Sequence, residues 1–262
     1  MNIKMFTNDT KYLMLALDQR GSFGKMLATS DRQILAAKKK QIIEALSDMF
    51  TGLLLDPDYG LSGYKQSGCT KPFLLCGEES GYENVEGERL TKIKYKADEL
   101  KNMGASGAKL LVYFNPFLNS ATKQYETAKQ FLEDCHQVGL PVFFEIVTYG
   151  QALGKNLVIE SVKYFLERDF RPDVFKLEYP GDEASCKQIS NLLGDTNWIL
   201  LTAGAYFYEF LDRLEIACRN GCSGFLAGRS IWQDMVVKDM GQVERNIMRE
   251  RFAKIVAIAE KK

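Results

Sequence analysis

The sequence predicts an α/β protein built as a single (β/α)8 barrel of the TIM type, and three observations predict it. Eight short apolar runs, rich in Val, Leu, Ile and Phe, have the composition of strands that are buried on both faces of a parallel sheet. Amphipathic segments with helical period separate most of these runs. The chain of 262 residues shows no linker and no break in composition, and one barrel of this type takes roughly 250 residues. We therefore expect one domain over residues 1–262.

The apolar runs follow one another at intervals that suit a repeated strand and helix unit. Their starts are about twenty to forty residues apart, near the average length of one such unit in a barrel of about 250 residues. In chain order we expect strands at Tyr12–Leu17, Leu53–Leu55, Phe73–Cys76, Ala108–Phe114, Val142–Val147, Val174–Leu177, Trp198–Leu201 and Gly224–Ala227.

Helices are expected between these strands. Asp31–Phe50 and Glu88–Met103 carry apolar residues at helical spacing. Gly104, Gly139 and Gly221 each follow a helical segment and precede a strand, where a left-handed C-terminal cap is needed. The same ending recurs in three units, which favours a repeated architecture.

Two segments depart from the repeat. Pro57–Pro72 is short and Gly-rich, so we expect it to be mostly irregular. Ser230–Lys262 is longer than one helix, with a break expected at Gly241. A doubly wound open sheet also alternates strands and helices, but the turn after the first strand, Leu17–Gly21, matches neither G-x-G-x-x-G nor a P-loop. The barrel is therefore favoured.

Composition and charge exclude several classes of protein. Hydrophobic residues make up 46% and charged residues 26% of the chain, which is typical of a folded globular protein. Lys and Arg total 34, as do Asp and Glu, so no overall positive field attracts nucleic acid or anionic lipid. No apolar run approaches the roughly 18 to 20 residues of a membrane helix, and Met1–Thr10 is polar. We expect a cytoplasmic protein with neither a nucleic-acid nor a membrane partner.

Cysteine and histidine do not point to a metal site. The six cysteines form no CxxC pair and no metal spacing with histidine, so we expect reduced, mostly buried thiols. The single histidine, His136, precedes the fifth predicted strand and so belongs to the end of the barrel opposite the usual active site. The run Lys38–Lys40 is interpreted as a solvated helix face. We expect no metal and no cofactor.

Charged and polar residues gather where the predicted strands end. In barrels of this type the chemistry lies at the C-terminal ends of the strands. The residues at those ends, or within the strands themselves, are Asp18, Asp56, Glu78, Glu79, Lys109, Glu145, Lys176, Glu178, Thr202–Gly204 and Gly228–Arg229. We expect them to share one rim of the barrel.

Lys109, Glu145 and Lys176 interrupt apolar strands, where burying a lone ion costs several kcal/mol. Their strands are neighbours in a barrel, so two lysines and one carboxylate are expected within ion-pair distance. Surplus positive charge and burial lower the pKa of a lysine, and a neutral amine attacks a carbonyl carbon to give a Schiff base. The residues alone do not choose between Lys109 and Lys176 as the nucleophile. A buried ion pair that only fixes packing is the alternative.

The last two strand ends suit a phosphate group. Loops after the seventh and eighth strands of barrel enzymes commonly bind phosphate through backbone N–H groups. Thr202, Ala203 and Gly204 lie in one of these loops, and Gly228 and Arg229 lie in the other. Glycine allows close approach, and arginine offers a bidentate clamp. Tight turns with an incidental arginine are the alternative interpretation.

The same strand ends carry motifs of a known family. The motifs are LALDQRG (Leu15–Gly21), LLLDPDYGL (Leu53–Leu61), EESGYE (Glu78–Glu83), GAKLLVYF (Gly107–Phe114), FFEIVTY (Phe143–Tyr149), DVFKLEYP (Asp173–Pro180), LTAG (Leu201–Gly204) and GFLAGRSIW (Gly224–Trp232). Each is weak singly, but in this order and on these strands they form a specific set. Through most of its length the chain thus resembles the class I tagatose 1,6-bisphosphate aldolases, in the larger group that also contains deoxyribose-phosphate aldolase.

The resemblance implies roles for individual residues. Lys176, in DVFKLEYP, falls where the Schiff-base lysine of the family lies, with Lys109 and Glu145 matching the buried lysine and glutamate beside it. Asp18 matches a polar residue that contacts the substrate. For binding of the substrate and its phosphate we expect Gln19, Arg20, Asp56, Thr202, Ala203, Gly204, Gly228 and Arg229.

The implied activity is that of a metal-independent class I aldolase that cleaves a ketohexose phosphate. The first expected substrate is tagatose 1,6-bisphosphate, which gives dihydroxyacetone phosphate and glyceraldehyde 3-phosphate. Segments Pro57–Lys71 and Gln151–Asn156 are shorter than in the family, which leaves the binding of a second phosphate open. We also expect a homo-oligomer.

Three other activities stay open at this point. The first is a related aldolase of 6-deoxy-6-sulfofructose 1-phosphate or a sulfofructose transaldolase, although the DPDYG and EESGYE loops favour the tagatose branch. The second is a catalytically weak regulatory protein that senses a sugar phosphate. The third is a phosphate-binding isomerase or synthase barrel, which forms no covalent adduct.

Overall fold

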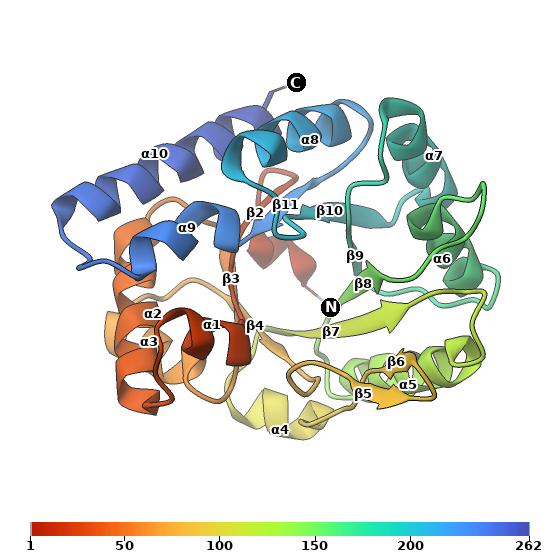
Figure 1. The fold of residues 1–262 in the computed structure, drawn as a ribbon, viewed down its shortest axis with the longest axis horizontal. Helices are drawn as coiled ribbons and strands as arrows, with labels where there is room; N and C mark the ends of the chain where they lie inside the picture. The colour runs from red at the N-terminus through yellow and green to blue at the C-terminus, as the bar shows by residue number, and fades with distance from the viewer. Residues whose placement is uncertain (1, 262) are drawn as a thin grey trace.

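Eight parallel strands close into a barrel at the centre of the molecule (Figure 1). The computed structural model describes residues 2–261. Each barrel strand pairs with the next and the last pairs with the first, so the barrel has no free edge. The barrel strands are β2 (Lys11–Leu17), β3 (Gly52–Leu55), β4 (Phe73–Cys76), β7 (Gly107–Phe114), β8 (Val142–Thr148), β9 (Val174–Leu177), β10 (Asn197–Leu201) and β11 (Gly224–Ala227). The predicted TIM-type barrel is confirmed.

All the predicted strands are present, and their ends differ from the expected ones by at most one residue. Their side chains alternate between two cores, because successive residues of a strand point to opposite faces. The outward-facing side chains pack against helices. The inward-facing ones form a small core of their own, with Phe6, Tyr12, Met14, Ala16, Leu54, Leu74, Phe143, Val174, Ile199 and Leu226.

An outer ring of helices covers the barrel (Figure 1). They are α1 (Gly21–Met26), α2 (Arg32–Leu46), α3 (Gly60–Ser67), α4 (Ala97–Asn102), α5 (Ala121–Gln137), α6 (Leu157–Leu166), α7 (Glu183–Leu193), α8 (Phe207–Arg219), α9 (Arg229–Val236) and α10 (Gln242–Ala259). Helix α2 begins after Asp31, whose carboxylate accepts a hydrogen bond from the N–H of Gln33 at 2.8 Å. The helix then buries Leu35, Ile42 and Ile43.

The N-terminal segment fills the end of the barrel where the strands begin. It forms a short 3-10 helix, η1 (Ile3–Phe6), and a two-residue strand, β1 (Thr7–Asn8), that pairs antiparallel with β2. Phe6 is fully buried, and its ring lies edge-on to Phe143 inside the barrel at 5.3 Å between centroids. Gly52, at the start of β3, makes room for it, since a Cβ there would lie 2.7 Å from the Phe6 ring. This end of the barrel is therefore closed.

A small hairpin lies beside the other end, the mouth of the barrel. Its strands are β5 (Glu83–Val85) and β6 (Glu88–Leu90), which pair antiparallel. The guanidinium of Arg89 stacks on Tyr113 of β7 and on Tyr149, with 5.8 and 4.9 Å to the ring centroids. The N–H of Arg89 also donates to the Tyr149 hydroxyl at 3.0 Å. These contacts hold the hairpin against the ends of β7 and β8.

The segment Pro57–Pro72 contains a helix where the sequence predicts mostly irregular chain. Helix α3 occupies half of it and ends at Gly68, whose φ of 70° is left-handed. The first residue of the helix, Gly60, packs so closely that a Cβ would lie 2.5 Å from the Asp56 carboxylate. The glycines that suggested a loop thus serve a tightly packed helix.

The single helix predicted over Glu88–Met103 is wrong. Its first residues form strand β6, in which Leu90 is buried, and only α4 is helical. Apolar residues at helical spacing here belong to two separate elements. The expected break at Gly241 is confirmed, because this residue lies between α9 and α10 as the N-cap of α10.

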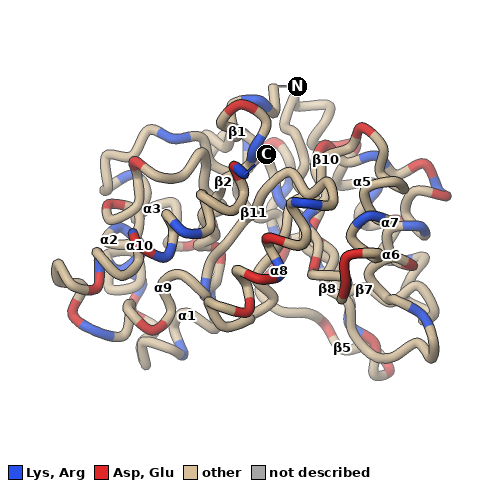
Figure 2. Tube along the Cα trace, turned by 90° about the horizontal axis from the view of Figure 1, so that it is seen from above, with Lys and Arg blue, Asp and Glu red and all other residues tan. Residues whose placement is uncertain are grey.

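Basic and acidic residues are intermingled around the outer helices (Figure 2). This distribution agrees with the equal numbers of the two kinds in the sequence. Within residues 2–261, none of the helices combines the length and the apolar character that crossing a bilayer requires.

We predict a large loss of stability when the aromatic cluster under α6 is truncated. The Phe165 ring is fully buried and lies 4.7 Å from those of Phe114 and Phe144. Phe165→Ala should lower the free energy of unfolding by about 3–5 kcal/mol, measured by urea denaturation. Leu153→Ala is the control, because its side chain is 97% exposed and should cost less than about 0.5 kcal/mol. Equal losses in the two variants would contradict the packing described.

Candidate active site

A cavity of about 420 Å³ opens at the C-terminal ends of the strands, opposite the end closed by the N-terminal segment. Side chains from every barrel strand or its following loop line it, except those of β3. Its polar residues are Asp18, Gln19, Arg20, Ser22, Glu78, Glu79, Ser80, Lys109, Tyr113, Glu145, Lys176, Glu178, Thr202 and Arg229. The predicted common rim thus exists and encloses a pocket.

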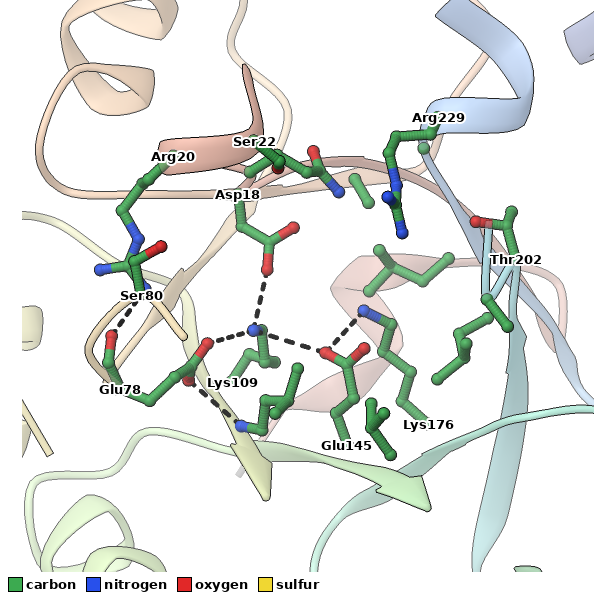
Figure 3. A pocket seen from close by; sticks show the side chains of 18 of the residues that line it. Asp18, Arg20, Ser22, Glu78, Ser80, Lys109, Glu145, Lys176, Thr202 and Arg229 are labelled. Carbon is green, nitrogen blue, oxygen red and sulfur yellow. Dashed lines mark hydrogen bonds and ion pairs between the residues drawn. The ribbon is translucent and has the colours of Figure 1, made fainter. Parts of the chain in front are cut away.

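The ammonium group of Lys109 is the centre of this cavity (Figure 3). The side chain is 1% exposed, and it leaves β7 toward the inside of the barrel. Its nitrogen contacts the carboxylates of Asp18 (2.8 Å), Glu78 and Glu145 (3.4 Å). The other oxygen of Glu78 accepts the backbone N–H of Leu111 at 3.1 Å, which fixes that carboxylate against β7.

The charges of the cluster differ from the expected ones. Two lysines were expected to face one carboxylate, but three carboxylates surround Lys109, so the expected surplus of positive charge is wrong. Burial alone would lower the pKa of Lys109, but Asp18, Glu78 and Glu145 outweigh it and hold the pKa well above its usual value. Burial likewise would raise the pKa of Asp18, but Lys109 and Lys176 together hold it well below its usual value. Lys109 is therefore a fixed cation.

Lys176 has a different environment, although it lies next to this cluster (Figure 3). Its nitrogen is 2.8 Å from Oε2 of Glu145, the oxygen that also faces Lys109. The pairing of β8 with β9 places Glu145 and Lys176 side by side in the sheet. Among the described residues, Glu145 is the one carboxylate within 4.0 Å of the Lys176 nitrogen. Lys176 is 4% exposed and lines the cavity.

The loops after β10 and β11 meet beside Lys176. Ala203 and Gly204 both have left-handed backbones, with φ of 49° and 77°, and such residues turn successive N–H groups toward one side. A Cβ on Gly204 would lie 3.5 Å from the guanidinium of Arg229, so the two loops are adjacent. Gly228 has no room for a side chain, because a Cβ would lie 2.9 Å from the carbonyl oxygen of Ala16. Of the predicted phosphate residues, Gly204 does not line the cavity. The four that do are Thr202, Ala203, Gly228 and Arg229.

The loop after β2 continues the cavity wall on the side of β11, because β2 pairs with β11. Asp18 points at Lys109, and the amide of Gln19 lies near Gly228. Arg20 is 9% exposed, and its guanidinium donates to the backbone carbonyl of Glu78 at 2.7 Å. These three residues line the cavity as expected from the sequence.

Asp56 does not line the cavity, in contrast to the expectation that it binds substrate. It is fully buried behind the loop after β2, in an ion pair with Lys39 of α2. Lys39 is also fully buried, so the interpretation of Lys38–Lys40 as a solvated face is wrong at this position. The buried ammonium needs a counter-charge, and Asp56 supplies it.

The structure adds residues to the site that the sequence prediction passed over. Glu78 was noted only as a rim residue, and Tyr113 and Ser22 were not singled out. Glu178 accepts hydrogen bonds from the N–H and hydroxyl of Thr148, both at 2.7 Å. Burial, with a smaller contribution from Glu145, raises its pKa. Tyr113 lies two residues along β7 from Leu111, which also lines the cavity, a spacing that could have identified it. Glu178, already expected at the rim, lies two residues after Lys176.

Comparison with known proteins bears on this geometry. Residues 12–234 match the family model described as DeoC/LacD family aldolase. The chain belongs to this aldolase family. The predicted family and the predicted enzyme class, a class I aldolase, are confirmed.

The proteins that are similar to this aldolase carry the names of sugar-phosphate aldolases. Tagatose 1,6-diphosphate aldolase 2 of Streptococcus pyogenes is 26% identical, over 85% of this chain and 80% of its own length. Tagatose 1,6-diphosphate aldolase 1 of Streptococcus mutans is 27% identical, over 85% and 81%. Among solved structures, an archaeal fructose 1,6-bisphosphate aldolase superposes with a TM-score of 0.74 at 18% identity, and a Schiff base forming fructose-1,6-bisphosphate aldolase with 0.70 at 17%. Each covers 97% of both chains and shows the same barrel fold.

We predict that Lys109 is the main electrostatic support of the aldolase site. Lys109→Met leaves three buried carboxylates without their cation, which should lower the free energy of unfolding by about 3–5 kcal/mol near pH 7. The pKa of Asp18 should rise in the variant. Because the native pKa of Asp18 is lowered, its contribution is complete above the unfolded-state value of about 3.9 and is lost as the pH falls through the native value. The stability difference should therefore shrink in acid.

Urea denaturation of both proteins between pH 2 and 7 measures this difference. Lys129→Met serves as the control, because Lys129 makes an exposed ion pair with Glu133 on α5 and should change little. A difference that stays constant down to pH 2 would contradict the ion cluster around Lys109.

Proposed function

We propose that this protein is a Schiff-base aldolase that cleaves tagatose 1,6-bisphosphate to dihydroxyacetone phosphate and glyceraldehyde 3-phosphate. One observation carries the proposal: the cavity holds two lysines in unequal environments. Lys109 is held as a cation by three carboxylates, whereas Lys176 meets one carboxylate and borders open space. Only an amine without its extra proton attacks a carbonyl, so the geometry favours Lys176 as the nucleophile.

In the proposed reaction the Lys176 amine adds to the C2 carbonyl, and loss of water gives a protonated iminium. A base then takes the proton of the C4 hydroxyl, the C3–C4 bond breaks, and its electron pair moves into the iminium to form an enamine. The C4 carbon leaves as the aldehyde. Protonation of the enamine at C3 and hydrolysis release dihydroxyacetone phosphate and free the amine.

Glu145 is placed for the proton transfers, because one of its oxygens is 2.8 Å from the Lys176 nitrogen. Lys109 and Asp18 act beside it. The Lys109 cation holds both carboxylates in place, and Asp18 is available to orient sugar hydroxyls at the cavity wall. Charge in this pocket is thus arranged before the substrate enters, which is the condition for electrostatic catalysis.

The wall made by the loops after β10 and β11 would hold the C1 phosphate. The left-handed turn at Ala203 and Gly204 supplies backbone N–H groups, and Arg229 supplies a guanidinium next to it. Lys176 lines the same cavity, so a phosphate bound there would bring C2 toward the amine. Tagatose stands first among ketohexoses because the similar proteins at 26–27% identity carry that name.

We predict that borohydride reduction in the presence of dihydroxyacetone phosphate traps the substrate on Lys176, as detected by peptide mass mapping. Lys176→Met should form no adduct and should lose turnover by about four orders of magnitude or more. Lys109→Met should still form the adduct on Lys176. A tag on Lys109 in the wild type would reverse the assignment, and a wild type without any tag would remove the imine mechanism.

We predict a higher kcat/KM for tagatose 1,6-bisphosphate than for 6-deoxy-6-sulfofructose 1-phosphate, measured by coupled release of the three-carbon product. The phosphate and the sulfonate differ in charge, and the loop motifs favour the tagatose branch. A preference for the sulfonate would assign the protein to the sulfosugar branch. Binding of these sugars without turnover of either would favour the sensing function.

A further inference from the structure

A second buried ion pair lies outside the cavity, directly behind the loop that carries Asp18. It joins Lys39 of α2 to Asp56 at the end of β3, and both side chains are fully buried. Removing two charges from water costs several kcal/mol for each ion. An apolar pair would fill the same space in a barrel core, so the charges call for a use other than packing.

The contacts of the Lys39 ammonium show where its hydrogens go. They are directed to the Asp56 carboxylate, to the backbone carbonyl of Leu17, and to the backbone carbonyl of Gln19 at 2.9 Å. An ammonium group has three hydrogens, so all of them are used. Leu17 and Gln19 flank Asp18 in the sequence. One cation thus holds the peptide on either side of a residue that faces the cavity.

The ion pair is itself held by two helices. The second oxygen of Asp56 accepts the N–H groups of Tyr59 and Gly60, at 2.8 and 3.2 Å, where α3 begins. The Lys39 nitrogen lies 4.6 Å from the centroid of the Tyr59 ring. Helices α2 and α3 pack so closely that a Cβ on Gly63 would lie 2.6 Å from a backbone carbonyl of α2. The ammonium position therefore follows the rigid outer layer of the barrel.

On the cavity side, the loop after β2 makes a charged contact with Lys109. Asp18 reaches the Lys109 nitrogen at 2.8 Å, and the amide of Gln19 lies by Gly228 in the neighbouring loop after β11. A displacement of about 1 Å at such a position can cost about 100-fold in rate.

We propose that the Lys39–Asp56 pair is a positioning device that sets the place of Asp18 in the active site. It acts through the backbone of Leu17 and Gln19 and touches neither substrate nor the reacting atoms. The inference rests on the proposed part of Asp18 in the reaction. It assigns a task to the residue pair that the sequence interpretation took for a solvated lysine and a substrate ligand.

The test is a double variant that removes both charges while keeping volume and shape, Lys39→Met with Asp56→Asn. Lys39→Met alone leaves a buried carboxylate without a cation and should be strongly destabilised. The double variant should recover part of that loss, because no lone charge stays buried. Its melting temperature should lie between those of Lys39→Met and the wild type, since the carbonyls of Leu17 and Gln19 still lack the Lys39 donor. Its kcat should nevertheless stay about 10- to 100-fold low, with a smaller change in KM, while borohydride still traps the adduct on Lys176.

Two further measurements keep the outcome decisive. Asp56→Asn alone keeps the Oδ1 acceptor for Tyr59 and Gly60, but it turns an amide NH2 group toward the buried Lys39 ammonium and removes its counter-charge. This variant should therefore be destabilised as Lys39→Met alone is, and the recovery in the double variant then reports the pair. Lys40→Met is the matched control, because Lys40 lies on the same helix and pairs with Glu44 instead. It should change neither kcat nor the pKa of Asp18. A folded double variant with kcat within twofold of the wild type would overturn the proposal.

A readout without turnover separates this inference from the proposed function. NMR titration of the Asp18 carboxyl should give a higher pKa in the double variant than in the wild type, since a displaced loop weakens the contact with Lys109. Loss of the Lys39 charge acts on this pKa in the same direction. Amide hydrogen exchange in the loop after β2 separates the two effects, because it becomes faster only where the loop has lost its support. If the wild type forms no adduct, the proposed function fails, and hydrogen exchange in this loop together with the Asp18 titration still decides the positioning effect. An unchanged Asp18 pKa in the double variant would contradict positioning in either case.

Discussion

The ammonium of Lys109, surrounded by the carboxylates of three different segments, is the interaction on which the site depends. Asp18 comes from the loop after β2, Glu78 from the loop after β4, and Glu145 from β8. None of these acids is tolerable in a dry barrel without a cation, and the cation is not tolerable without them. By fixing where the negative charge lies, Lys109 also leaves Lys176 with a single carboxylate partner. The different roles that we propose for the two lysines follow from that allocation.

The register of the strands places these charged side chains next to one another. Glu145 lies opposite Leu111 on one side and Lys176 on the other, so its side chain points inward between the strands that carry the two lysines. The barrel supplies rigidity from the inside, through its apolar filling, and the helices supply it from the outside. Lys39 joins the outer layer to the loop of Asp18. The catalytic arrangement is therefore supported from both sides of the sheet.

The strands and the charges within them could be predicted, because a buried strand rarely carries an ion unless that ion belongs to a site or to a buried pair. The number of carboxylates could not, since nothing in the pattern shows that Glu78 turns inward from its loop while Glu79 belongs to the rim. Lys39 is an instructive case. It looks like its neighbours Lys38 and Lys40, yet Leu35, Ile42 and Leu46 stand at spacings of four, three and seven from it, on the buried stripe of α2. The spacing of these apolar residues predicts that Lys39 is buried, but the run of three lysines was interpreted as exposed. Asp56 could not be placed without knowing that Lys39 lies behind it.

The position of the Phe6 ring determines where ligands enter and leave the barrel. Because the N-terminal segment closes one end of the barrel, ligands enter and leave through the other end alone. In the proposed cleavage one fragment stays covalently attached to Lys176, so the detached aldehyde leaves through this opening before the tethered half. The order of product release then follows from the covalent bond, and both products share one exit.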